Sequence, residues 1–341
     1  MAPVAIIGGG ISGIAAAHEL GRHRIATAIF EATPRLGGRV STVERGPVRF
    51  DDGAQFIRTD TPMAAQLLLN DLPSDLLFDI TREVLPFDRR GHIGPGDPAQ
   101  NALPKWGYRG GLMVLPRLLA ASSRARIHLG WPVASLTRSR IGWQVSGPRG
   151  EAGNFRAVLV TLPPMAARAL AILDGSLTRA HGAPGKGTHR TIISVAFEPD
   201  SPPSAPAGAY AFVNTDRQHA ISWLAFESAK PGHVPAGREV VVAQMAHDWS
   251  APRLGLPDIT IAAEAVALCS AFLKSRVVPR WAHVTRWAEA LPDTTVTLSL
   301  DDEDGGLFFA GDAFAGGRVH LALESGLAAA TRIRRQLDAQ S

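Results

Sequence analysis

Cysteine, lysine and tyrosine are scarce in this chain of 341 residues, and the shortage of cysteine has the clearest consequence. The single cysteine, Cys269, cannot form a disulfide within the chain. It lies in an apolar stretch, so we expect a buried core residue rather than a nucleophile, in a protein of the reducing cytoplasm. A fold held together by internal disulfides is excluded.

Long apolar runs are absent as well. No segment approaches the roughly 18 consecutive apolar residues that a membrane span requires. The uncharged opening, residues 1–17, lacks a basic start and is interrupted by four glycines. We therefore expect a strand, a turn and a helix there, and neither a signal peptide nor a membrane span.

The charge pattern gives no sign of a nucleic-acid partner or a metal. The chain has 35 Lys and Arg against 31 Asp and Glu, for a formal net charge of +4. The basic residues stand singly, without the basic and aromatic runs typical of nucleic-acid surfaces. The 11 histidines show neither metal-ligand spacing nor a Ser-His-Asp grouping, so no metal site is expected.

A glycine-rich turn near the start, Gly8–Gly13, is the most informative feature of the chain. An apolar run precedes it, an Ala-rich helix follows, and Glu31 closes the next apolar strand 18 positions past Gly13. In such a turn Gly8 bends the chain, Gly10 lets a pyrophosphate approach the backbone, and Gly13 lets the helix pack closely. Glu31 can accept hydrogen bonds from both ribose hydroxyls. The pattern predicts an adenine dinucleotide with its pyrophosphate at the helix N-terminus.

Two further segments narrow the cofactor. A second glycine turn carrying Arg35 and Arg39 follows Glu31, and arginine neutralises phosphate through its planar fork. With the later segment FDDGAQF at residues 50–56, it resembles the FAD-binding signature of the flavin amine oxidase superfamily. Near the other end, an apolar strand stops at Gly311-Asp312, a pair that contacts the ribityl and phosphate region of FAD in that superfamily. Both ends of the chain are therefore expected to build one FAD site.

The resemblance implies FAD as the cofactor and names the residues that contact it. Val133 would touch the adenine through its backbone, Asp312 would accept a ribityl hydroxyl, and the last helix would point its N-terminus at the flavin pyrimidine. The residues expected to contact FAD are Gly8, Gly10, Ile11, Ser12, Gly13, Glu31, Ala32, Arg35, Gly38, Arg39, Gly53, Ala54, Gln55, Phe56, Val133, Gly311, Asp312 and Val319.

The patterns along the chain predict an α/β fold of two domains. The first is a Rossmann-like FAD-binding domain of the two-dinucleotide-binding type with an inserted β-meander, built from residues 1–57, 105–164 and 286–341. The second is an α+β domain with a mostly antiparallel sheet, built from residues 58–104 and 165–285, where strands with alternating apolar positions recur.

Local patterns predict individual elements inside these domains. They are a hairpin over residues 77–93, meander strands at 126–129, 133–138 and 142–146, a buried strand at 155–162 and a helix at 258–274.

Blocks in the second half of the chain are similar to a narrower group, renalase and its bacterial relatives. These blocks are residues 221–225, 228–233 and 240–250. The similarity implies a small-molecule hydride donor, an isomeric dihydronicotinamide dinucleotide, with molecular oxygen as the acceptor and hydrogen peroxide as a product.

His320, Gln55 and Trp223 are the expected catalytic residues. His320 is expected near the flavin pyrimidine because it stands at the start of the last helix. The chain departs from renalases there, where they carry an acidic residue and a glycine, and at His233, where they carry an arginine.

Two other functions stay open. One is an oxidase or desaturase of a small amine or biosynthetic intermediate, which a cage made by an aromatic pair, with a lysine near the flavin ring, would support. With only Tyr108 and Tyr210 as tyrosines, and only Phe314 aromatic between Asp312 and His320, that cage is poorly supplied. The other is a flavin-binding scaffold or sensor without turnover. A second bound NAD(P)H that reduces the flavin is not expected, because only one dinucleotide fingerprint is present.

Overall fold

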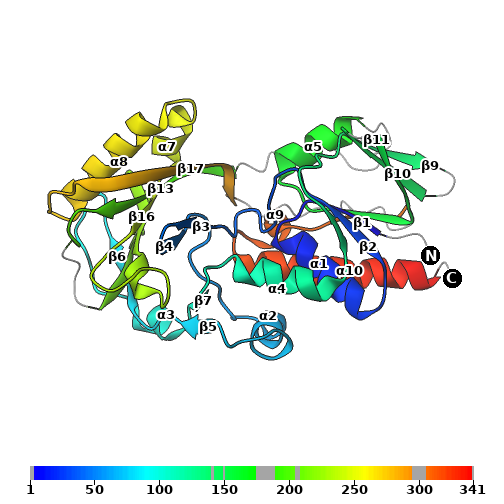
Figure 1. The fold of residues 1–341 in the computed structure, drawn as a ribbon, viewed down its shortest axis with the longest axis horizontal. Coiled ribbons are helices and arrows are strands. Elements are labelled where there is room, and N and C mark those ends of the chain that lie inside the picture. Colours follow the sequence, from blue (N-terminus) through cyan, green and yellow to red (C-terminus); the bar gives the residue numbers. More distant parts are fainter. Residues whose placement is uncertain are drawn as a thin grey trace.

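The computed structural model describes residues 4–139, 142–148, 150–173, 189–203, 208–293 and 305–339. Within these ranges a parallel sheet of five strands holds the two ends of the chain together (Figure 1). Its order is β18 (Leu307–Phe309), β12 (Ala157–Val160), β1 (Val4–Ile7), β2 (Thr27–Phe30) and β8 (Arg126–His128). Strand β1 lies at the centre, so the glycine turn that follows it emerges from the middle of the sheet.

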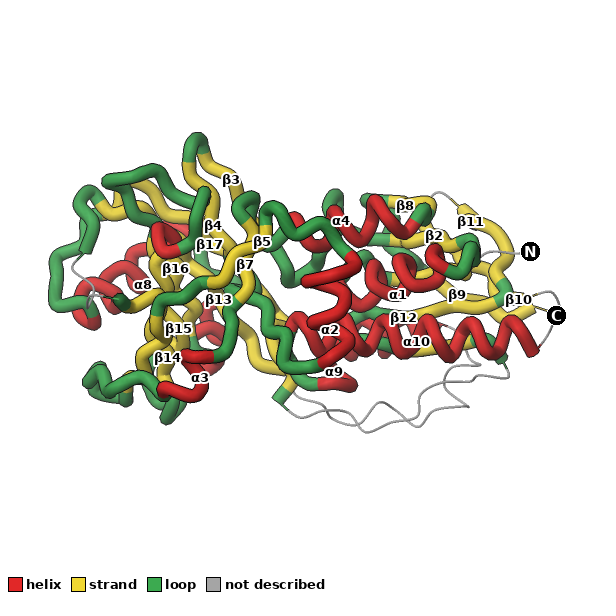
Figure 2. The backbone as a smooth tube through the Cα atoms, turned by 90° about the horizontal axis from the view of Figure 1, so that it is seen from below, coloured by secondary structure: helices red, strands yellow, loops and turns green. Residues whose placement is uncertain are grey.

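The parallel sheet is covered on both faces because its strands are apolar on both sides. Val4 and Ile6 of β1 face the helices, whereas Ala5 and Ile7 join the core on the opposite face. The helical layer consists of α1 (Ile11–Arg22), α4 (Val114–Ser123) and α10 (Val319–Ala339), which Figure 2 shows side by side. The other layer is the meander β9 (Ser135–Ser139), β10 (Gly142–Gly147) and β11 (Gly150–Phe155), with α5 (Pro164–Leu173) beside it.

A second sheet forms the other half of the molecule (Figure 1). Its six described strands are, in order, β17 (Pro279–Pro292), β13 (His189–Pro199), β16 (Val241–Met245), β15 (Ile221–Phe226), β14 (Ala209–Asn214) and β6 (Glu83–Phe87). All neighbours are antiparallel except β14 and β6. Helix α8 (Asp258–Phe272) packs on one face, where Cys269 is fully buried and its burial raises the thiol pKa to about 12.

The other face of this sheet receives the hairpin β3 (Thr42–Arg45) and β4 (Val48–Asp51), whose Val48 and Phe50 pack on Ala196 and Val242. Smaller elements complete the described chain: α2 (Pro62–Gln66), η1 (Leu67–Asp71), β5 (Leu77–Asp79), α3 (Pro98–Ala102), β7 (Trp106–Tyr108), η2 (Glu227–Ala229), α7 (His247–Ser250), η3 (Ala251–Arg253) and α9 (Asp312–Ala315). The predicted α/β fold with a Rossmann-like sheet and a second, mostly antiparallel sheet is confirmed. No helix in the described part is long and apolar enough to cross a membrane.

Two local predictions were wrong about pairing partners. Residues 77–93 do not form a hairpin, because β5 pairs with β7 and β6 joins the six-stranded sheet beside β14. Residues 126–128 belong to the parallel sheet, and residues 150–155 supply the third meander strand. Strands do lie within residues 77–93 and at 126–128, but the strand at 150–155 was not predicted. Short segments do not encode which distant strand they meet.

The predicted division into domains remains a proposal. Strand β17 runs across the expected boundary at residue 286 and pairs along nearly its full length with β13.

Candidate active site

The glycine turn after β1 has the shape that a close backbone approach requires. Gly8 has φ +108°, and a Cβ on Gly13 would lie 2.2 Å from the Gly8 carbonyl oxygen, so neither position tolerates a side chain. A Cβ on Gly10 would meet nothing within 4 Å. Helix α1 begins here without a side-chain cap, and its first N–H groups are left for another partner. The turn therefore offers open space beside free donors.

Glu31 is fixed between two turns at the end of β2. Its carboxylate accepts hydrogen bonds from Gly9 N at 2.7 Å and Thr33 N at 2.8 Å. The Trp131 N–H donates to the Glu31 carbonyl, which brings the segment leading to Val133 beside the expected adenosine end. Val133 packs against the core under the meander, while Ala32 is exposed.

Arg39 and Asp312, both expected to contact the cofactor, contact each other. The guanidinium makes a two-pronged ion pair with the carboxylate, with N–O distances of 2.7 and 2.6 Å. Arg39 also donates to the carbonyls of Glu289 and Ala290. Arg35 instead donates to Ser41 Oγ at 2.5 Å. The Arg39 pair joins the second glycine turn to the C-terminal Gly-Asp segment.

The last helix lies directly against the first. Ser12 Oγ donates to the Ala322 carbonyl at 2.7 Å, and a Cβ on Gly326 would lie 2.1 Å from Ser12 O. Gly311, with φ +152°, donates its N–H to Ser325 Oγ. Val319 is partly buried at the start of this helix. Residues 8–13 and 311–312 thus belong to one assembled region.

The turn formed by residues 51–56 is held by side chains from the six-stranded sheet. Trp287 Nε1 donates to the Asp52 carbonyl at 2.9 Å and Gln244 Nε2 donates to the Gly53 carbonyl at 2.5 Å. Ala54 N donates to the Arg39 carbonyl. These bonds bind the turn to both halves of the molecule.

The same turn carries donors that the protein does not use. The N–H groups of Gly53, Gln55 and Phe56 have no partner among the described residues, although most carbonyls of the turn are occupied. A Cβ on Gly53 would lie 2.0 Å from the Arg39 carbonyl, which explains the glycine. Free amides beside occupied carbonyls suit a ligand ring that carries acceptor atoms.

Gln55 and Trp223 lie in one cluster with Tyr210 and Phe56. The Trp223 ring centroid is 6.0 Å from that of Tyr210 and 6.1 Å from that of Phe56. Tyr210 donates to the Gln55 carbonyl at 3.1 Å. Gln55 Oε1 and Trp223 Nε1 are buried without a partner in the described part of the chain. One is an acceptor and the other a donor.

Among the described residues, His320 has no direct contact with that cluster, although Arg58 neighbours both His320 and the Phe56 ring. The described contacts join it to neither Gln55 nor Trp223, and its charged neighbours are Asp60, Arg318, Glu324 and Arg58. It is 3% exposed, and burial lowers its pKa from the ordinary 6.5 despite the opposing effect of Asp60. The ring is therefore uncharged at neutral pH. The three expected catalytic residues are not brought together by direct contacts, so the role of each remains a proposal.

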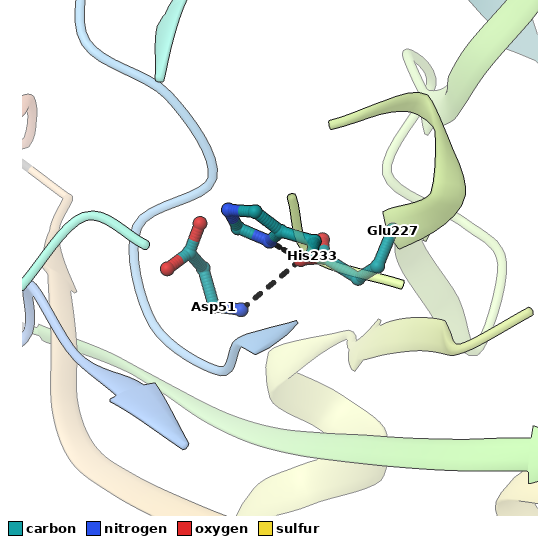
Figure 3. A group of neighbouring side chains, drawn as sticks. All are labelled: Asp51, Glu227 and His233. Atoms are coloured by element: carbon teal, nitrogen blue, oxygen red, sulfur yellow. Dashed lines mark hydrogen bonds and ion pairs between the residues drawn. The ribbon is translucent and has the colours of Figure 1, made fainter. Parts of the chain in front are cut away.

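A buried charge set of Asp51, Glu227, Lys230 and His233 was not predicted as a unit. Figure 3 shows three of its members, Asp51, Glu227 and His233. Lys230 Nζ lies 2.9 Å from Asp51 Oδ2 and 2.8 Å from Glu227 Oε1, although the second contact has a poor angle for a hydrogen bond. Glu227 Oε2 lies 2.8 Å from His233 Nδ1. Burial alone would raise the pKa of Glu227, but Lys230 and His233 outweigh it and lower that pKa.

The carboxylates and the histidine of this set are close enough to bind a metal ion, but the ammonium of Lys230 already lies between the carboxylates. We therefore assign the set to charge pairing. The signal available in the sequence was Lys230 itself, one of only four lysines.

Comparison with known proteins places this arrangement in a family. Residues 87–334 match the family described as flavin containing amine oxidoreductase, and residues 6–72 match the NAD(P)-binding Rossmann-like domain. The first match covers most of the chain, so the chain belongs to the flavin-containing amine oxidoreductase family. It is an FAD-dependent oxidoreductase. The open space at Gly10, the free amides of the 51–56 turn and the unpartnered Gln55 oxygen fit a dinucleotide with a polar ring.

Individual relatives resemble the chain over different lengths. Protoporphyrinogen oxidase 2 of Arabidopsis thaliana is 35% identical over 65 residues, and protoporphyrinogen oxidase of Nicotiana tabacum is 41% identical over 51 residues. These stretches cover 19% and 15% of this chain, and 13% and 10% of the relatives.

Two solved structures match over 99% of both chains. A proposed protoporphyrinogen oxidase from an Exiguobacterium species has a TM-score of 0.80 at 16% identity, and cyclohexylamine oxidase from Brevibacterium oxydans has 0.75 at 15%. At such identities the likeness shows the shared fold.

Proposed function

We propose that this enzyme takes a hydride from an isomeric dihydronicotinamide dinucleotide and passes the electrons to molecular oxygen, giving hydrogen peroxide. The observation that carries the proposal is the pair of unpartnered atoms at Gln55 Oε1 and Trp223 Nε1. The similarity to renalases in residues 221–225 and 228–233 supports it.

A buried donor and a buried acceptor without partners are costly until a ligand supplies both complements. A carboxamide carries both complements: its carbonyl would accept from Trp223 Nε1, and its N–H would donate to Gln55 Oε1. An alkylammonium group carries only donors and leaves the indole N–H unpaired. The two side chains therefore favour a donor with a carboxamide over a simple amine.

The residues that would hold FAD are the glycine turn at 8–13, Glu31, the 51–56 turn, and Arg39 with Asp312. When bound, FAD accepts a hydride equivalent and returns the electrons to an acceptor. The chain itself supplies backbone donors, an uncapped helix terminus and a ribose-binding carboxylate. Each of these binds or orients a group without transferring a proton.

The proposed donor needs no acid–base pair at the flavin. A dihydronicotinamide loses one hydride and its ring becomes an aromatic cation, so no base is needed. A protonated amine, in contrast, has to lose a proton before its carbon can release a hydride. His320, uncharged at neutral pH, would act in this reaction as a hydrogen-bonding group and not as a fixed charge.

Oxidation of a small amine is the second candidate. Phe56 and Trp223 offer aromatic surface to an apolar substituent, with 45° between their ring planes. Tyr108 and Tyr210 cannot complete a cage, since both are fully buried and the Tyr210 hydroxyl is bonded to Gln55. The amine reading thus has fewer residues to support it.

Anaerobic mixing of the FAD-loaded enzyme with candidate donors tests the proposal. Isomeric dihydronicotinamide dinucleotides, ordinary NADH and simple amines are compared by the rate of flavin bleaching, and peroxide is measured after oxygen is admitted. We expect the isomers to bleach the flavin fastest, with one peroxide per donor. Faster bleaching by an amine would favour the second candidate, and no fast donor at all would indicate a flavin-binding scaffold.

A further inference from the structure

We propose that the charge set of Asp51, Glu227, Lys230 and His233 is a positioning unit that fixes the 51–56 turn against the cofactor and sets its reduction potential. The proposal rests on the FAD site described under the proposed function, but not on the identity of the hydride donor. Asp51 belongs to the 51–56 turn through its backbone, but none of the four side chains is assigned to contact FAD or substrate.

The four side chains pair their charges with one another with almost no access to solvent. Every member has 0 or 1% of its side chain exposed. Asp51 Oδ1 also accepts from Thr42 Oγ1 at 2.6 Å and Leu112 N at 2.9 Å. A buried carboxylate needs such donors, because it has lost its water shell.

His233 completes the balance of charge. Its Nδ1 faces the Glu227 carboxylate at 2.8 Å, and its Nε2 faces the Tyr108 carbonyl at 3.1 Å. Both partners are acceptors only, so both ring nitrogens have to carry hydrogen for both bonds to form. The set then holds two negative and two positive charges and is neutral as a whole.

Asp51 connects the charge set to the 51–56 turn through its backbone hydrogen bonds. Its N–H donates to Glu227 Oε2 at 3.2 Å, and its carbonyl accepts from Gln55 Nε2 at 2.5 Å. The Gln55 amide group also donates to the Gly53 carbonyl at 3.2 Å. With its nitrogen committed to two carbonyls, Gln55 presents its oxygen as a pure acceptor. Lys230 thereby acts through Asp51 on the orientation of Gln55.

Tyr210 provides a second connection between Lys230 and Gln55. Lys230 Nζ lies 5.8 Å from the centre of the Tyr210 ring, and Tyr210 donates to the Gln55 carbonyl. The low dielectric of this buried region lets the charges act on a neighbouring cofactor with little screening. Reduction adds electrons to a flavin, so a lost positive charge should disfavour it and a lost negative charge should favour it.

Two substitutions test the proposal on the FAD-loaded protein, with the midpoint potential measured by dye equilibration and no substrate present. Glu227→Gln should raise the midpoint potential of the flavin and Lys230→Met should lower it. Each shift should be at least about 30 mV, which for a two-electron couple is a tenfold change in the equilibrium constant of reduction. The visible flavin spectrum should shift in both variants. Glu227→Gln is nearly isosteric and keeps the test available if Lys230→Met does not fold.

Glu198→Gln serves as the matched control. Glu198 is also a buried carboxylate of the six-stranded sheet, paired with Arg238 at 2.7 Å, and no described hydrogen bond joins it to residues 51–56. It should lower the melting temperature and leave the potential unchanged. An unchanged potential in Glu227→Gln, or shifts of the same sign in both charge-set variants, would overturn the proposal. Failure of dihydronicotinamide donors to react would leave this measurement unaffected.

Discussion

At the residue scale, the glycines of the first turn have different roles: one is needed for folding and another for cofactor binding. A Cβ on Gly13 collides with backbone, so that glycine serves the packing of α1 on the sheet. A Cβ on Gly10 meets no atom of the described residues within 4 Å. The described fold does not require glycine at residue 10. A ligand that touches the backbone there does require it.

Gly10→Ala and Gly13→Ala should therefore fail in different ways. We expect Gly10→Ala to change the unfolding free energy of the apo protein by less than about 0.5 kcal/mol and to weaken FAD binding at least tenfold. Gly13→Ala should destabilise the apo protein by about 2 kcal/mol or more, because overpacking against backbone has no easy relief. Urea unfolding and FAD titration measure the two effects. Equal FAD affinity in Gly10→Ala and the parent would contradict the assignment.

The residues that the sequence predicts to contact FAD lie close enough to form a single site. Their contacts with one another were not predictable. The Arg39 and Asp312 pair spans 273 positions, and nothing local in either segment encodes it. The partners of the 51–56 turn were not predictable either, since Tyr210 and Gln244 reach Gln55 and Gly53 from strands of the other sheet. Local spacing specifies turn chemistry, whereas such pairings follow from tertiary packing.

At the element scale, α1 is held between the parallel sheet and two other helices. Its His18 is buried against α4, where Nδ1 lies 2.6 Å from Ser122 Oγ. Burial lowers the pKa of His18 from 6.5, with Arg22 adding to the effect. The folded state thus prefers the neutral ring more strongly than the unfolded state does.

This preference predicts an acid-sensitive packing of α1 on α4. As the pH falls below 6.5, the unfolded state binds a proton at His18 before the folded state does, so stability decreases. His18→Gln should remove that part of the pH dependence. Urea unfolding of the apo proteins between about pH 7.5 and 5.5 compares the slopes. An unchanged slope in His18→Gln would show that another group is responsible.

Elements were predictable from the sequence to different degrees. The two Ala-rich helices and the buried strands β1, β2 and β12 follow from apolar runs bounded by turn residues. The pairing partners of short strands could not be predicted in this way, and β5, β6 and β8 were predicted to pair with the wrong neighbours. Each has only three to five residues, so its own pattern carries little information about register or partner.

At the scale of the whole molecule, distant parts of the chain meet at the 51–56 turn and at the Arg39 pair. The turn is held by the six-stranded sheet, and Arg39 joins it to the C-terminal segment before α10. The two sheets were predictable from the change of pattern along the chain, from continuous apolar strands to alternating ones. The contact between the two sheets at this turn was not predictable, because it depends on side chains from three separate strands.

Asp312→Asn tests the link between the chain ends. The substitution keeps the shape but removes the charge that Arg39 binds with two hydrogen bonds, so we expect a loss of about 2 kcal/mol in unfolding free energy of the apo protein. Asp258→Asn, which breaks the exposed pair with Arg286, should cost less than about 0.5 kcal/mol. Similar small losses in both variants would mean that the Arg39 pair does not stabilise the assembly.

The proposed chemistry is tested most directly by single-turnover flavin reduction with two donors that differ only in the carboxamide. One is the isomeric dihydronicotinamide dinucleotide and the other is its carboxylate counterpart. The account predicts that the amide reduces the flavin about fivefold faster or more, because the carboxylate has no N–H for Gln55 Oε1 and one net hydrogen bond contributes about 1 kcal/mol. Gln55→Leu should remove most of this advantage. Trp249→Phe, in α7, should leave it intact. Equal rates for the two donors, or an advantage that survives in Gln55→Leu, would contradict the account.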